Sequence, residues 1–344
     1  MVIRNANNRT LLEPNLTTSF SLQTSCEINE SYKYIFLPLC YSFTLVLSLT
    51  LNSIILYRSL RRTKRWNPSL LYMFNLALTD FMYGLSLPFL IASYIMKNQW
   101  VFGDFMCRLV RFLFYFNLYC SIFFLTCISF HRYLGICHPM KSINRGKKKT
   151  VRVVCVLVWF VIFALTSPIF RFARTESSAN LTSCWDDAVD KDLLNYVPYG
   201  MFLHLLGFFV PFCIIAWCYS RVVSTIFKTM NSQQFQSGTP AMEKRRKSIK
   251  TVVTITFLFA LCFLPFHITR TLFLILRVMR NIDCHTVNVV SICYKVTRPL
   301  ASFNAWLNAL LYFLTKDKWR QTCLKPVKTE NDSKSSGNIF KPFT

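Results

Sequence analysis

Seven apolar stretches, each long enough to cross a lipid bilayer, dominate this sequence of 344 residues. A transmembrane helix needs roughly 20 mostly apolar residues, whereas an apolar run of about 10–14 residues is more typical of a buried core helix. The stretches lie at residues 34–57, 69–96, 109–130, 151–170, 197–219, 251–276 and 287–314. We therefore predict an all-α membrane protein, with a seven-helix bundle over residues 34–314, a tail over residues 1–33 and a second tail over residues 315–344.

The composition agrees with a membrane protein and argues against a soluble enzyme. Hydrophobic residues make up 53% of the chain and charged residues only 16%, whereas a soluble domain carries about 25% charged residues. The sequence contains no zinc-ligand spacing, phosphate-binding loop or G-x-S-x-G motif. It also lacks the inverted repeat of many transporters. We predict no enzymatic activity and no cofactor.

The net charge of +25 is concentrated in alternate loops and in the C-terminal tail. The basic residues are Arg58, Arg61, Arg62, Lys64 and Arg65 after the first span, Lys141, Arg145, Lys147, Lys148 and Lys149 after the third, Lys244, Arg245, Arg246, Lys247 and Lys250 before the sixth, and Lys316, Lys318, Arg320, Lys325 and Lys328 after the seventh. The positive-inside rule assigns these segments to the cytoplasm and the N-terminus to the outside. Topology and anionic inner-leaflet lipid explain the charge, so we expect a lipid bilayer and no nucleic acid as partner.

Features of the predicted outer side agree with this topology. N-glycosylation sequons begin at Asn8, Asn15, Asn29 and Asn180. Four of the 14 cysteines lie on the same side, where the environment is oxidising. We expect Cys107 to pair with Cys184, and Cys26 with Cys284. Past the last span, we expect a short amphipathic helix at the membrane interface over residues 316–323, with Cys323 as a candidate for palmitoylation.

Cationic side chains inside the spans are the main functional candidates, because a charge at the bilayer centre costs roughly 2.5–3.5 kcal/mol. At a rise of about 1.5 Å per residue, Arg111 lies about 31 Å above Arg132. The same estimate puts Arg270, Lys295 and Arg298 in the outer third of the bundle. Four like charges around one cavity favour a ligand with several negative oxygens. Arg binds phosphate through two parallel hydrogen bonds, and Lys supplies a point charge.

Other interpretations of these residues remain open. The cations could extend to the membrane interface, or pair with the acidic residues of the second outer loop, Asp186, Asp187, Asp190 and Asp192. Tyr115 lies one helical turn below Arg111, where it could stack on a base or belong to the core. His267 shares a helix face with Arg270.

An ordered set of motifs resembles the rhodopsin-like G-protein-coupled receptors. The set comprises Asn52, Asn75-Leu-Ala-Leu-Thr-Asp80, Trp100 before Cys107, His131-Arg-Tyr133, Trp159, Pro211 with Tyr219, Cys262-Phe-Leu-Pro265 and Asn308-Ala-Leu-Leu-Tyr312. The resemblance implies a seven-helix receptor at the plasma membrane, with a heterotrimeric G protein as partner and with arrestin and receptor kinases as further partners.

The resemblance also implies roles for residues in the lower bundle. Asp80, Ser121, Asn304 and Asn308 form a mid-membrane polar set that binds a sodium ion or water and relays movement. Phe263 and Pro265 belong to the hinge of the sixth span. Arg132, Tyr219 and Tyr312 belong to the switch at the inner end that engages the G protein. The chain departs from the family pattern at His131, which replaces an acidic residue, and at Ala309, which replaces a proline.

Four segments look more specifically like the metabotropic purinergic receptors, above all the branch for uridine and adenine nucleotides. These segments are residues 110–115, 127–139, 265–270 and 294–301. The resemblance implies an extracellular nucleotide ligand, an ion pair of Asp186 with Arg270 as a lid, and signalling through a Gq-class protein, phospholipase C and calcium. The oxoglutarate and succinate receptors share part of the pattern. A receptor for a dicarboxylate or an anionic lipid is therefore the alternative, and a transporter is a more distant one.

Overall fold

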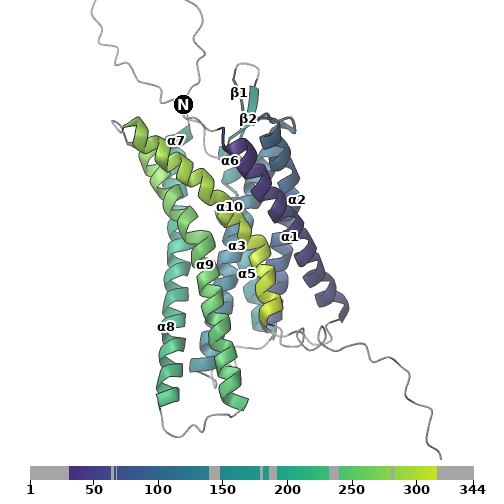
Figure 1. Cartoon of the computed structure of the whole chain (residues 1–344), viewed down its shortest axis with the longest axis vertical. Coiled ribbons are helices and arrows are strands. Elements are labelled where there is room, and N and C mark those ends of the chain that lie inside the picture. The colour runs from purple at the N-terminus through teal and green to yellow at the C-terminus, as the bar shows by residue number, and fades with distance from the viewer. Residues whose placement is uncertain are drawn as a thin grey trace, which may run out of the picture.

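The computed structural model describes residues 31–62, 66, 68–138, 148–178, 181–185, 192–231, 240–279 and 283–315. Within them seven helical spans run side by side (Figure 1). The spans are α1 (Lys33–Arg62), α2 (Pro68–Ile95), α3 (Gly103–Cys137), α5 (Lys148–Thr166), α7 (Leu193–His204) continued by η2 (Leu205–Phe209) and α8 (Val210–Asn231), α9 (Pro240–Val278) and α10 (Cys284–Thr315). The prediction of a seven-helix membrane bundle is confirmed.

Six of the spans are long and apolar enough to cross a membrane by length and composition. The remaining span, α10, carries Lys295, Arg298 and several asparagines, which lower its mean hydropathy. Large apolar side chains such as Phe160, which is 74% exposed, cover the outside of the bundle. An exposed apolar surface of this extent fits contact with lipid.

Five of the seven spans are longer than the apolar stretches that predicted them. The third span was predicted over residues 109–130, but α3 runs from Gly103 to Cys137. Hydropathy misses these terminal turns because their polar side chains extend past the hydrocarbon. The fourth span was predicted as one segment over residues 151–170, but α5 ends at Thr166 and the short α6 (Ile169–Phe172) follows Pro168. Proline disfavours helical backbone in the residue before it, which explains the break.

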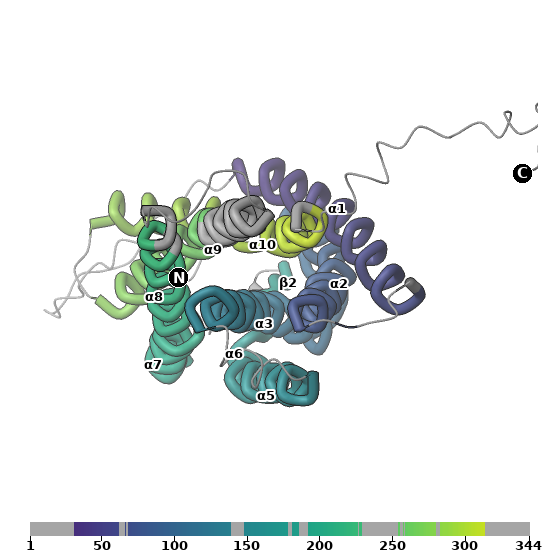
Figure 2. Tube along the Cα trace, turned by 90° about the horizontal axis from the view of Figure 1, so that it is seen from below, coloured from purple at the N-terminus to yellow at the C-terminus, as the bar shows by residue number. Residues whose placement is uncertain are grey.

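α3 lies at the centre of the bundle and contacts α2, α5, α8, α9 and α10 (Figure 2). Its buried residues extend from Cys107 to Leu134, over almost its whole length. A helix in this position can hold side chains from five of the other spans. The candidate sites described below all include residues of α3.

A two-stranded hairpin lies at one end of the bundle, which we call the hairpin end (Figure 1). β1 (Thr175–Ser178) and β2 (Leu181–Cys184) pair antiparallel, with Thr175 opposite Cys184. The predicted disulfide between Cys107 and Cys184 is confirmed, with the two Cα atoms 5.6 Å apart. Cys284 is disulfide-bonded, and its predicted partner, Cys26, lies outside the described residues.

Candidate ligand-binding and switching sites

Three arginines from three helices are buried in the half of the bundle nearest the hairpin. Arg270 on α9 is 0% exposed, and Arg111 on α3 and Arg298 on α10 are each 5% exposed. Lys295, one turn from Arg298 on α10, is half-buried. Such burial does not fit the interpretation in which these side chains extend to the membrane interface. The four cations predicted from the sequence as ligand contacts therefore lie within the bundle.

Tyrosine rings surround the guanidinium group of Arg270. Its Nη1 donates a hydrogen bond to the hydroxyl of Tyr294 on α10 over 2.7 Å, and its Nη2 donates one to the hydroxyl of Tyr196 on α7. The guanidinium carbon lies 4.9 Å from the ring centre of Tyr294 and 5.7 Å from that of Tyr196. Tyr115 on α3 lies 6.0 Å away on the same measure. These contacts stabilise a buried cation through both hydrogen bonds and ring faces.

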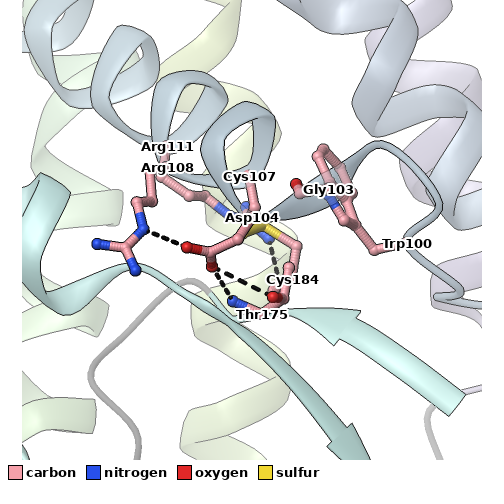
Figure 3. The surroundings of a disulfide bond; sticks show 8 residues. All are labelled: Trp100, Gly103, Asp104, Cys107, Arg108, Arg111, Thr175 and Cys184. Atoms are coloured by element: carbon pink, nitrogen blue, oxygen red, sulfur yellow. Dashed lines mark hydrogen bonds and ion pairs between the residues drawn. A yellow bond between two sulfur atoms is a disulfide. The ribbon is translucent and has the colours of Figure 1, made fainter.

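The other two buried arginines face α3 and the hairpin. The guanidinium carbon of Arg298 lies 4.9 Å from the ring centre of Phe114 on α3. Nη2 of Arg111 donates a 2.8 Å hydrogen bond to the backbone carbonyl of Cys184 (Figure 3). Arg111 is therefore tied to the disulfide-linked strand β2.

His267 lies on α9 beneath Arg270 and is fully buried. Its ring stacks on Phe208 at 4.1 Å and meets the ring of His204 edge-on at 5.0 Å. Neither ring nitrogen has a hydrogen-bond partner in the part of the chain that the structure describes. Tyr115, also predicted as a ligand contact, is buried between Phe114 and Arg270. Asp186, the predicted lid, lies outside the described residues.

A second polar site lies around Asp80 at the middle of the bundle. Asn117 donates to one carboxylate oxygen of Asp80 over 2.7 Å and Ser121 donates to the same oxygen over 3.4 Å. Asn308 on α10 donates to the other oxygen over 3.2 Å. Three of the predicted residues are thus brought together across α2, α3 and α10.

Asn304, the fourth predicted member, makes no hydrogen bond to Asp80. Its buried carboxamide has no hydrogen-bond partner among the described residues, and it lines a cavity of about 10 Å³ with Asn308 and Phe263. Carboxylate and hydroxyl oxygens suit a hard cation, and Asp80 and Ser121 supply such oxygens, whereas Asn117 and Asn308 present their amide N–H groups to Asp80. No cluster of three or more His, Cys, Asp or Glu side chains suited to a metal occurs in the described ranges.

The end of the bundle opposite the hairpin carries Arg132 and the residues predicted to switch with it. The hydroxyl groups of Tyr219 on α8 and Ser129 on α3 are 2.6 Å apart, which joins the two helices one turn above Arg132. Tyr312 is buried on α10, and Pro265 lies within α9. Asn8, Asn15, Asn29, Asn180 and Cys323 lie outside the described residues.

Sequence reasoning missed several residues that complete these sites. Asn117, the nearest partner of Asp80, lies four residues before Ser121 on the same helix face, and that spacing could have revealed it. Tyr294 begins one of the segments that resemble the purinergic receptors, and it lies four residues before Arg298. Tyr196 gives no such signal, because only the fold brings the start of α7 to α9.

Comparison with known proteins agrees with this geometry. The profile described as 7 transmembrane receptor (rhodopsin family) matches residues 51–312. The match covers most of the chain and includes all the helices that carry the two sites. The chain is therefore a rhodopsin-family receptor, a multi-pass protein of the plasma membrane, and not an enzyme.

Individual relatives narrow the family further. The chain is 42% identical to purinoceptor 4 of Xenopus laevis over 303 residues, which cover 88% of this chain and 56% of that protein. It is 41% identical to purinoceptor 4 of Rattus norvegicus, over 86% of this chain and 80% of that protein. It is 42% identical to purinoceptor 2 of Homo sapiens, over 84% of this chain and 75% of that protein. The chain belongs to this family of purinoceptors.

Proposed function

We propose that this receptor binds an extracellular uridine or adenine nucleotide through the cations of its hairpin end. The observation that carries the proposal is the convergence of Arg111, Arg270, Lys295 and Arg298 from three helices. A di- or triphosphate matches this arrangement, because guanidinium groups bind phosphate oxygens in pairs of parallel hydrogen bonds. Tyr115, His267 and Asp186 are the further ligand contacts of the proposal. The purinoceptor relatives support a ligand of this class.

The energy available is sufficient for the proposed ligand. A hydrogen bond to a charged group contributes roughly 1.5–3 kcal/mol net. Three or four such bonds therefore account for micromolar binding, about 8 kcal/mol, once the costs of association are subtracted. The same cations would also bind a dicarboxylate or an anionic lipid headgroup, so ligand length and charge must decide between the classes.

The proposal extends to topology and signalling. The N-terminus and the hairpin end face the outside and the C-terminus faces the cytoplasm, as the basic loops predict. The ligand favours one of two arrangements of the bundle by binding it more tightly. The receptor then acts through a Gq-class protein, phospholipase C and calcium, and arrestin and receptor kinases are further partners. A sodium ion at Asp80 would favour one of the two arrangements.

A calcium assay in cells tests the ligand class. Wild type, Arg298→Ala, Arg298→Lys and Lys295→Arg are compared with uridine and adenosine mono-, di- and triphosphates, after correction for surface expression. We expect Arg298→Ala to lose about 10- to 150-fold in potency, which corresponds to one charged hydrogen-bonded pair. Arg298→Lys should also lose potency because the guanidinium fork is gone, whereas Lys295→Arg should lose less.

The phosphate series supplies the control. A contact with phosphate predicts greater losses for triphosphates than for monophosphates, whereas a purely structural role lowers every response equally. Equal shifts for all three chain lengths, or a response to dicarboxylates alone, would overturn the nucleotide proposal.

A further inference from the structure

Asp104, in the first turn of α3, joins this helix to the β1–β2 hairpin (Figure 3). Its Oδ2 accepts a 2.6 Å hydrogen bond from Nε of Arg108. Its Oδ1 accepts hydrogen bonds from the backbone N–H of Thr175 over 2.8 Å and from the Thr175 hydroxyl over 3.2 Å. One carboxylate oxygen thus acts within α3 and the other holds β1.

The strand position that Asp104 holds lies directly opposite the disulfide. Thr175 pairs with Cys184 in the hairpin, and Cys184 is bonded to Cys107. The carbonyl of Cys184 accepts the 2.8 Å hydrogen bond from Arg111. Asp104, Cys107 and Arg111 are spaced three and four residues apart, so they follow one face of α3. A continuous chain of contacts therefore leads from Asp104 through the hairpin to Arg111.

The contact with Thr175 supplies a constraint that the disulfide lacks. A disulfide fixes a separation, but rotation about its single bonds leaves the attached strand free to turn. The backbone N–H of Trp100 donates a 2.7 Å hydrogen bond to the backbone carbonyl of Thr182 and so secures the β2 side. Asp104 secures the β1 side. With both strands held, the carbonyl of Cys184 points in one direction.

We propose that Asp104 is a positioning residue of the anion-binding site: by anchoring the hairpin at Thr175, it holds the carbonyl of Cys184 where that carbonyl orients Arg111. The inference rests on the proposed function, in which Arg111 binds anionic oxygens of the ligand. The ion pair of Asp104 with Arg108 is partly exposed, and exposed pairs contribute little energy. The role of the carboxylate is therefore geometric.

The direction in which Asp104→Ala changes ligand potency distinguishes a positioning role from a long-range electrostatic effect. Removing a negative charge from the hairpin end strengthens the attraction for an anionic ligand, so a long-range effect of Asp104→Ala would raise potency. Loss of positioning lowers it. Glu176 provides a matched control on the same strand, because its carboxylate makes no hydrogen bond or ion pair with the residues that the structure describes.

The test compares Asp104→Ala, Asp104→Asn and Glu176→Ala, using calcium responses to uridine and adenosine di- and triphosphates at matched surface expression. We expect Asp104→Ala to lose about three- to tenfold in potency, the equivalent of one hydrogen bond. Asp104→Asn keeps an acceptor oxygen for Thr175 and should lose less, although it removes the same charge. Glu176→Ala should keep or slightly raise potency. Equal responses of Asp104→Ala and Glu176→Ala would overturn the proposal.

Two further measurements keep this inference distinct from the proposed function. In the double variant with Arg111→Ala, Asp104→Ala should add no further loss, and additive losses would exclude the route through Arg111. In nucleotide-free receptor, amide hydrogen exchange of residues 175–178 and 181–184 should be faster in Asp104→Ala than in Glu176→Ala. Unchanged exchange overturns the anchoring role by itself. An Arg111→Ala receptor with normal potency would instead contradict the proposed ligand contacts.

Discussion

At the scale of single residues, Arg270 illustrates how this bundle keeps a cation away from water. A charge without compensating partners is very costly to bury. Arg270 is fully buried, and two phenol oxygens together with aromatic ring faces replace part of its hydration. Tyr196 belongs to α7 and Tyr294 to α10. Their hydrogen bonds with Arg270 therefore also join these two helices to α9. Changes in either tyrosine should therefore act on the ligand site through the orientation of the guanidinium group.

The variant Tyr294→Phe tests this dependence. It retains the ring beside Arg270 and removes only the hydroxyl that accepts the 2.7 Å hydrogen bond. We expect nucleotide potency to fall by about tenfold, as for loss of one hydrogen bond to a charged group. The measurement is the calcium response at matched surface expression. Tyr94→Phe, another buried tyrosine that stacks on Tyr41, is the control, and an equal effect in both variants would count against the role of the hydroxyl.

At the scale of elements, the π-helical turn η2 brings α8 close to α3. A Cβ atom added at Gly207 in η2 would lie 2.4 Å from the ring of Tyr119. This ring is fully buried and cannot move aside without displacing its neighbours. The absence of a side chain at Gly207 is thus what lets the two backbones approach, and His267 lies against the same ring at 5.9 Å between ring centres.

Gly207→Ala should therefore destabilise the receptor by about 1–3 kcal/mol, the usual cost of overpacking a core. The measurement is the thermal unfolding temperature of detergent-solubilised, nucleotide-free protein. Gly135→Ala is the matched control, because no atom lies within 4 Å of its added Cβ. In that helical position alanine should leave the free energy of unfolding unchanged or raise it by about 0.5–1 kcal/mol. A stability of Gly207→Ala equal to that of Gly135→Ala would refute the close packing.

The elements also show how far the sequence could predict the structure. Hydropathy located every span, because burial in lipid requires long apolar runs. It did not locate the hairpin, because the strand β1, with the sequence Thr-Glu-Ser-Ser, has no alternation of apolar and polar residues. The hairpin is held instead by Asp104 and the disulfide. The cations were predictable because charges within spans are rare. Their tyrosine partners were not, because tyrosine is also an ordinary core residue.

At the scale of the whole molecule, α3 makes hydrogen bonds to other elements near the hairpin, at the middle of the bundle and near the opposite end. Arg111 reaches the hairpin, Asn117 and Ser121 bond Asp80, and Ser129 contacts the hydroxyl of Tyr219. Arg132 follows one turn later. These contacts join α3 to α2, to α8 and, through Ser121 and Asn308, to α10 along a single continuous helix. Our proposal assigns ligand binding to one end of α3 and G-protein coupling to the other.

The variant Arg132→Ala tests this separation of binding from coupling. Arg132 lies 21 residues after Arg111 along α3, about 31 Å at the helical rise. We expect nucleotide affinity in the absence of G protein to be unchanged, because no ligand contact is removed. Receptor-stimulated nucleotide exchange on a purified Gq-class protein should be lost. If the variant also binds the G protein less tightly when nucleotide is bound, linkage requires that the effect of the G protein on nucleotide affinity falls by the same factor.

Arg152→Ala is the control for this experiment. It removes an exposed cation from the same end of the bundle, on α5, and should preserve both affinity and exchange. If Arg132→Ala weakened nucleotide binding without G protein, the two ends would not be separable. If exchange persisted at the wild-type rate, Arg132 would have no part in coupling, and the G-protein contact would have to lie elsewhere on the receptor.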